Sequence, residues 1–127
     1  MTAKLRDWIT SYPGFAGREF TEDMLLSGAD AAGIFFKGEQ VLSHRTDILG
    51  GIYCRRRVNL SLLLRSREKR QMSQCLADFV RWAERTAPVL GQQQTVRAEQ
   101  AKLRHAAGTG ITTYEIQVAL EFTEITR

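Results

Sequence analysis

The chain has 127 residues, which suits one domain, residues 1–127, with a single hydrophobic core that needs no disulfide support. Its hydrophobic share of 43% and charged share of 25% are those of a folded globular protein and exclude intrinsic disorder. No apolar run approaches the roughly 20 residues of a membrane helix, and the N-terminus lacks the apolar core of a signal peptide. We therefore expect synthesis in the cytoplasm and no membrane partner.

The net charge of +4 is unevenly distributed along the chain. Between residues 44 and 70, eight arginines and lysines stand against two acidic residues, an excess of six positive charges. A cluster of this kind can serve a nucleic acid, an acidic protein surface or solubility, and composition alone does not choose among them.

The first predicted element is a short amphipathic helix over residues 2–11. Leu5, Trp8 and Ile9 share one face of this helix, and the Tyr-Pro-Gly that follows ends it. A single apolar stripe must be buried against another element, so we expect the helix to dock on a sheet.

Three short strands are expected next, at residues 20–25, 31–37 and 40–45. Residues 46–51 then form a turn, because the two glycines that close this segment permit backbone angles that other residues resist.

The strongest pattern in the chain is an alternation from Gly50 to Arg65, which predicts a long half-buried strand. Its apolar side carries Ile52, Cys54, Val58, Leu60, Leu62 and Leu64. Arg56 alone interrupts this side, near the glycine end, where a long guanidinium can reach water. These 16 residues span about 50 Å at roughly 3.3 Å each, more than one small sheet needs. Part of the strand should therefore project beyond its own domain toward a partner.

A helix is predicted from a Ser66 cap to Arg85. Its apolar stripe follows the helical period without a gap and consists of Met72, Cys75, Leu76, Phe79, Val80 and Ala83. Trp82 lies beside this stripe, so it either covers an edge of the core or meets another subunit.

Residues 94–106 combine strong helix propensity with a poor helical stripe, and as a strand they alternate only with a bulge near Gln100. After a Gly-Thr-Gly connection, residues 112–123 alternate along their whole length, which predicts a strand. Its apolar face matches that of the arginine-bearing strand, so the two strands are expected to cover the same helix.

Patterns that carry catalysis or ligand binding are weak. His44 lies near Asp47, and His105 is the only other histidine, but neither shows the orienting partner and pocket that a general base needs. Cys54 and Cys75 fall on apolar faces and are expected to be buried thiols rather than disulfide or metal ligands. The Gly-Thr-Gly connection does not join a strand to a helix as a phosphate loop does. We therefore expect neither an enzyme nor a metal or other cofactor.

The arginines of the long strand offer the sharpest functional alternatives. Arg55, Arg57 and Arg65 share its polar side, with Arg55 and Arg57 about 6 to 7 Å apart. Three interpretations are open, namely ion pairs with acidic residues of an adjacent copy, contact with DNA, and a solvated face. The acidic candidates are Glu115, Glu121 and Glu124. Only Tyr53 offers an aromatic ring among these arginines, which weakens the case for nucleic acid, since its bases stack on such rings.

Four features carry a resemblance to a known family. They are the short helix ending in Tyr-Pro-Gly, the Gly-Gly turn before an Arg-rich strand, the helix sequence Phe79-Val80-Arg81-Trp82 and the closing strand 114–122. In this order the features resemble small proteins of tailed-phage head-to-tail modules, often labelled minor capsid proteins and similar to tail terminators. One feature departs from the family, because Asp47-Ile48-Leu49-Gly50-Gly51 replaces an aromatic-x-Asp-Gly turn before the central strand. The geometry of that turn is therefore not carried over.

The resemblance implies an α+β fold, in which a mixed, mainly antiparallel sheet packs against the N-terminal helix and one longer central helix. It also favours the strand interpretation of residues 94–106 over the helical one.

In function, the resemblance implies a structural protein of the virion, made in the host cytoplasm, that forms a ring, typically of six copies, and caps the tail tube. Its partners would be its own copies, the tail tube protein and the head-tail connector or stopper, with transient contact to genome DNA in the channel. The side chains expected at the interfaces are Arg55, Arg56, Arg57, Arg65, Trp82, Glu115 and Glu121. A neck or head-completion protein is the alternative within this class, and a small DNA-binding module using the arginine face is a more remote one.

Overall fold

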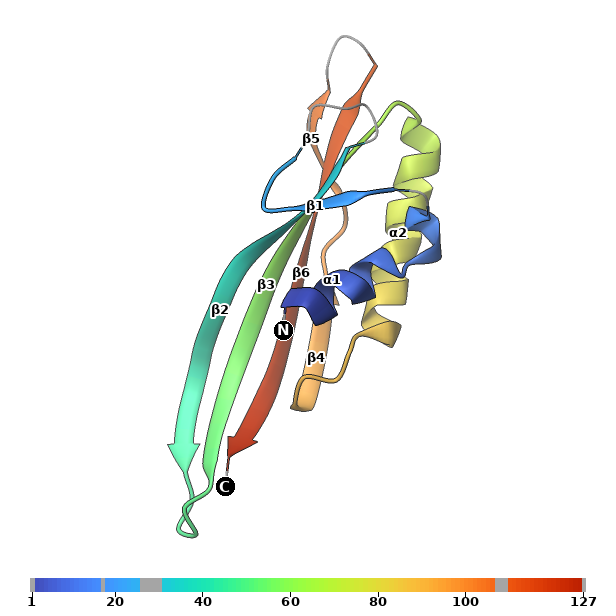
Figure 1. The fold of residues 1–127 in the computed structure, drawn as a ribbon. Helices are drawn as coiled ribbons and strands as arrows, with labels where there is room; N and C mark the ends of the chain where they lie inside the picture. Colours follow the sequence, from blue (N-terminus) through green and yellow to red (C-terminus); the bar gives the residue numbers. More distant parts are fainter. Residues whose placement is uncertain (1, 17, 26–30, 107–109, 127) are drawn as a thin grey trace.

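A computed structural model describes residues 2–16, 18–25, 31–106 and 110–126 of the chain. Within these residues the fold is a six-stranded sheet with two α-helices on one of its faces (Figure 1). The strand order is β1-β2-β3-β6-β4, and β5 pairs with β6 beyond the end of β4. The β1–β2 pair is parallel and the other pairs are antiparallel, so the expected α+β class is confirmed.

The elements follow one another in the order α1 (Thr2–Thr10), the 3₁₀ turn η1 (Pro13–Phe15), β1 (Phe20–Glu22), β2 (Ala32–Thr46), β3 (Ile52–Ser66), α2 (Lys69–Thr86), β4 (Gln92–Ala98), β5 (Lys102–Ala106) and β6 (Thr112–Thr126).

The two long strands predicted from alternation lie side by side as β3 and β6. Their antiparallel register places Val58 opposite Leu120 and Leu60 opposite Val118, and all four side chains are buried. These residues form the inner face of the sheet, which the helices cover. The opposite face, here called the outer face, carries the arginines and glutamates that alternate with them.

The helix layer confirms the two predicted apolar stripes. Met72, Leu76 and Phe79 of α2 are buried. Trp82 stacks on Trp8 of α1 with ring centroids 6.1 Å apart and an interplanar angle of 13°. Trp82 therefore covers the contact between the two helices of its own chain, which is the first of the two roles that the sequence left open.

The cap predicted at Ser66 is wrong. Ser66 ends β3, and α2 begins at Lys69 after Glu68. The Ser66 hydroxyl instead accepts a hydrogen bond from the Glu68 backbone N–H at 3.0 Å, so it stabilises the turn that leads into the helix.

The strands of the first third differ from the prediction. The first strand, β1, ends at Glu22 rather than at residue 25. The strands expected at 31–37 and 40–45 are one strand, β2. Its register against β3 shifts between Phe36 and Gly38, and Gly38 takes a positive φ of 115°. A glycine that reads as a strand end is here a bulge, and the strand continues through it.

The segment predicted as one bulged strand is two strands. β4 and β5 both pair with β6, and they are separated by residues 99–101. Within this gap the Glu99 N–H still donates to the Gln117 carbonyl at 2.9 Å. The interruption therefore exceeds the single extra residue expected near Gln100.

The sheet extends well past the helices that cover it (Figure 1). The 15 residues of β3 span about 50 Å, whereas the 18 residues of α2 span about 27 Å. Residues 37–57, which comprise the distal halves of β2 and β3 and the turn between them, form a projecting hairpin that we call the arm. The projection expected from strand length is confirmed. The arm is therefore the part of the molecule most available to contact a partner.

Candidate functional site: the arm and the outer face of the sheet

Asp47 organises the turn at the end of the arm. Its Oδ1 accepts hydrogen bonds from the backbone N–H groups of Gly51, at 2.7 Å, and Leu49, at 2.9 Å. Its Oδ2 accepts one from the Tyr53 hydroxyl at 3.1 Å. The hydrogen bond from Gly51, helped by those from Tyr53 and Leu49 and by the nearby charge of Arg45, lowers the pKa of the Asp47 carboxyl. The turn is therefore held by one ionised side chain.

This turn presents two aliphatic side chains to solvent. Ile48 is 101% exposed and Leu49 is 91% exposed. Ile52, at the first position of β3, is 38% exposed. These three residues form what we call the apolar tip. Gly50 allows the tight turn with a φ of 87°, an angle that a residue with a Cβ rarely adopts.

On the outer face, the central arginines are paired within the chain. The register of β3 and β6 places Arg57 directly opposite Glu121, and the Arg57 Nε donates to its Oε1 at 2.7 Å. Arg55 lies farther from the same carboxylate, with Nη2 3.8 Å from Oε2. Its Nη1 donates to the Gln93 carbonyl at 2.7 Å and to the Thr123 hydroxyl at 3.2 Å.

Arg56 lies on the inner face, beyond the helices. Its Nη1 donates to Glu39 of β2 at 3.1 Å. Its Nε lies 3.3 Å from a Glu124 oxygen of β6 without the geometry of a hydrogen bond, so this second contact is an ion pair only. The Arg56 side chain is 31% exposed, and its ion pairs join β3 to β2 and to β6. It reaches water as expected, but it also fixes the arm to β6.

The structure thus brings some of the predicted interface residues together and separates others. Arg55, Arg57 and Glu121 form one group. Ion pairs with an adjacent copy were one of the three interpretations left open by the sequence, and in the structure these pairs form within one chain. Arg65 lies at the opposite end of β3, where its carbonyl accepts a hydrogen bond from Arg18 at 3.1 Å. Glu115 lies on that same half of the sheet and accepts a hydrogen bond from Gln117 at 3.2 Å. An interface role for these side chains stays a prediction.

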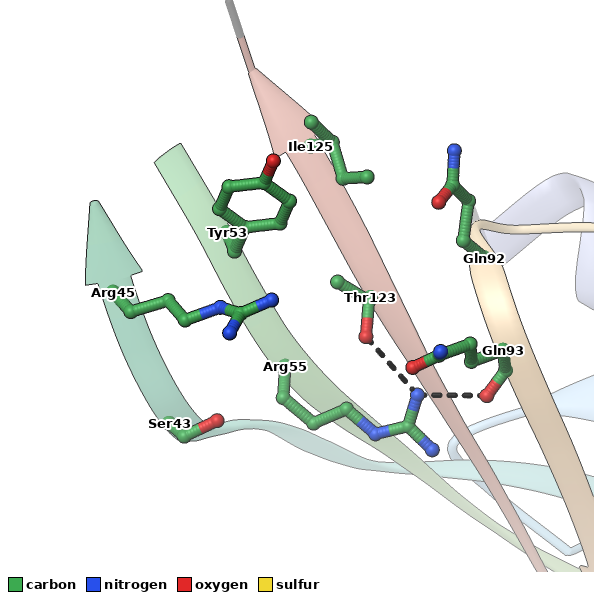
Figure 2. Close-up of a pocket in the computed structure, with 8 residues that line it drawn as sticks. All are labelled: Ser43, Arg45, Tyr53, Arg55, Gln92, Gln93, Thr123 and Ile125. Atoms are coloured by element: carbon green, nitrogen blue, oxygen red, sulfur yellow. Dashed lines mark hydrogen bonds between the residues drawn. The ribbon is translucent and has the colours of Figure 1, made fainter. Parts of the chain in front are cut away.

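Beside the arginines, the outer face is hollowed in the half of the arm that lies nearer its tip (Figure 2). The hollow encloses about 380 Å³ and is bordered by β2, β3, β6 and β4. A second, larger hollow of about 810 Å³ lies farther along the same face and includes Arg57, Arg97 and Lys37. Both are lined mainly by polar side chains, as the uncovered face of a sheet is expected to be.

Several residues of this region escaped sequence reasoning. The turn was predicted, but the role of Asp47 was not. An Asp side chain that accepts a hydrogen bond from the backbone N–H two residues later, as Asp47 does from Leu49, is a known turn signal. Arg45 was counted only as part of the basic cluster. Gln93 takes a positive φ of 51° at an irregularity of β4, and no local signal marks it.

Among the side chains that the structure describes, the remaining candidates do not form a reactive centre. His44 is exposed on the arm, and the side chain of His105 lies outside the described residues. Cys54 is buried and Cys75 half-buried, both as free thiols. In the described part of the chain, no group of three or more His, Cys, Asp or Glu could hold a metal ion. No helix among the described residues is long and apolar enough to cross a membrane.

No protein-family model matches the chain, and no curated protein matches its sequence.

Proposed function

We propose that this chain is a structural protein of a phage tail, similar to tail terminators, which forms a ring that caps the tail tube and contacts the head connector. The resemblance of the sequence supports this proposal at the level of the family. The observation that carries it at the level of the molecule is the projecting arm with its exposed apolar tip.

The apolar tip is suited to bind another protein. Burying an isoleucine or leucine side chain fully stabilises a complex by about 1.5–3 kcal/mol, so Ile48 and Leu49 together offer about 3–6 kcal/mol per copy. Because Asp47 already holds the turn through three hydrogen bonds, little backbone freedom is lost on binding. A rigid turn with two exposed aliphatic side chains has the properties of an interface anchor.

The shape of the molecule also suits a closed ring. The arm lies at one end of the molecule, beyond the part of the sheet that the helices cover (Figure 1). If the arm of one copy contacts a different surface on the next copy, the contact is heterologous, and repeating it closes a ring when the rotation between copies allows. This role involves no chemical turnover.

In this proposal the arginines support the arm rather than join one copy to the next. Arg57 is bonded to β6 through Glu121, and Arg56 joins β2, β3 and β6. Such cross-strand pairs hold the arm at a fixed angle to the body, which a ring of defined diameter requires.

The test replaces the tip while keeping the turn. In the double variant Ile48→Ser, Leu49→Ser, Asp47 and Gly50 are retained, so the monomer is expected to fold normally. Val89→Ser is the matched control, because Val89 is another aliphatic side chain that is 77% exposed, in the loop between α2 and β4 and outside the apolar tip. Native mass spectrometry, alone and with tail tube protein, should show a ring for the native chain and for the control, and mainly monomer for the tip variant.

A second measurement separates a tail terminator from a neck protein. A tail terminator stops growth of the tail tube, so electron microscopy should show tubes of limited length when the chain is added to polymerising tube protein. Binding to the connector without any effect on tube length would favour the neck or head-completion alternative. A native chain that stays monomeric both alone and with tube or connector protein would overturn the proposal.

A further inference from the structure

The hollow near the tip of the arm gathers hydrogen-bond donors from four strands. Arg45 and Ser43 come from β2, Arg55 from β3, Thr123 from β6 and Gln92 from β4. Figure 2 shows Arg45 and Arg55 extending from neighbouring strands into this same space. No acidic residue lines the hollow within the described part of the chain. Its lining therefore carries two positive charges and several neutral donors.

Arg45 brings a positive charge that no carboxylate neutralises by direct contact. Its guanidinium lies over the ring of Tyr53, with the central carbon 4.6 Å from the ring centroid. Among the described residues, no carboxylate oxygen lies within 4.0 Å of it. Asp47 feels its charge at a longer distance, but that carboxylate is occupied by its three turn hydrogen bonds. Stacking on Tyr53 orients the guanidinium and leaves its N–H groups for another acceptor.

Arg55 is held in place from one side. Its Nη1 donates to Gln93 and Thr123, and its Nη2 faces Glu121 at 3.8 Å. The positive φ of Gln93 lies within the irregular part of β4, next to the carbonyl that accepts this hydrogen bond. Arg55 also shares Glu121 with Arg57, so one carboxylate serves two guanidinium groups. The hollow thus keeps a net positive charge and has one of its two cations already positioned.

We propose that this hollow binds a phosphate of a nucleic-acid backbone. The donors surround the space from several strands, an arrangement that suits the tetrahedral oxygens of a phosphate. A carboxylate presents two oxygens in one plane and would leave some of these donors unused. Two guanidinium groups with neutral donors beside them match the side chains that usually contact DNA phosphates.

The surroundings favour a polymer over an isolated phosphate. The second hollow continues along the outer face, where Lys37, Arg57 and Arg97 outnumber the two carboxylates of Glu99 and Glu121. Neither α1 nor α2 covers this face (Figure 1), so a strand of nucleic acid can lie along the described part of it. Successive phosphates can therefore contact the first hollow and the cations beyond it. The inference is independent of ring formation and holds for the monomer.

The test measures binding of the full chain to a short labelled DNA duplex by fluorescence anisotropy, between about 50 and 200 mM salt. Arg45→Ala removes one exposed guanidinium that makes no ion pair by direct contact, so the fold is expected to be unaffected. Arg81→Ala is the matched control, since Arg81 is exposed on α2, in the layer that covers the other face of the sheet. Thermal unfolding of both variants checks that each is folded.

We expect Arg45→Ala to weaken binding about tenfold, as loss of a hydrogen bond to a charged group does, and to lower the slope of log K against log salt by about 0.9. Arg81→Ala should change neither value by a comparable amount. Equal effects of the two variants would overturn the assignment, because they would show that only net charge matters.

Two further measurements identify the source of the anion. Inorganic phosphate that binds the hollow, seen as NMR shifts at Arg45 and Thr123, without any binding of DNA would overturn the nucleic-acid assignment. A polyglutamate peptide that displaces the duplex at equal charge concentration would also overturn it. If DNA binding fails while a ring still assembles, this inference falls and the proposed function stands.

Discussion

The pair between Arg57 and Glu121 allows a direct test of whether the arginines support the fold of one chain or join two chains. Arg57→Glu places two carboxylates opposite each other at a directly paired position of β3 and β6. If the arginine served only to contact another copy, this change would weaken assembly and leave the monomer intact. The structure predicts instead that the monomer itself is destabilised.

The magnitude follows from the position of the pair. The two side chains are 39% and 29% exposed, so water screens them in part, and the attraction is worth about 0.5–1 kcal/mol. Repulsion between the two carboxylates adds a similar amount, giving a total loss of about 1–2 kcal/mol. For a domain of this size that loss lowers Tm by about 4–8 °C. The repulsive part should shrink at about 1 M salt, where the Debye length falls to roughly 3 Å.

Thermal unfolding measured by circular dichroism tests this on Arg57→Glu, on Glu121→Arg and on the double variant that swaps the charges. The swap should recover most of the lost Tm. Arg97→Glu is the matched control, because it makes the same charge change at an exposed position of β4 on the same face. An Arg57→Glu chain that melts like Arg97→Glu but fails to assemble would refute the reasoning and return the arginine to a subunit interface.

Three other predictions concern the body of the protein. Phe79→Ala should lower the free energy of unfolding in urea by about 3–5 kcal/mol, because this ring is fully buried, and a loss below about 1 kcal/mol would contradict that burial. Burial, with charges nearby, raises the pKa of Tyr12 to about 12. Because the unfolded chain releases this proton near pH 10, the stability that the buried hydroxyl contributes below pH 10 should be lost between pH 10 and 12. Tyr12→Phe removes the hydroxyl and its hydrogen bond to the Cys75 carbonyl, so the stability of this variant should not fall in that pH range for this reason. Gly91→Ala should cost about 1–3 kcal/mol, since the added Cβ would lie 2.5 Å from the Thr123 carbonyl oxygen, and an unchanged Tm would contradict the close approach of β4 to β6.

Much of the architecture can be predicted from local periodicity. The alternation that runs through Val58 and Leu60, the matching alternation of β6 and the stripe of α2 each define which face of an element is buried. These patterns can be recognised without the tertiary structure, because apolar side chains that recur with the period of a helix or strand all lie on one face of that element. Strand length likewise predicts the arm before any packing is known.

The sequence by itself determined which faces are apolar, how long the central strand is and where basic charge is concentrated. The tertiary structure decided which charges meet, because the register that places Arg57 opposite Glu121 depends on pairing between segments far apart in the chain. It also decided that Gly38 continues a strand rather than ending one, and that Arg45 shares a hollow with Arg55. In each case the outcome depends on the partner strand. The sequence pattern of one strand does not show which residues of another strand will pair with it.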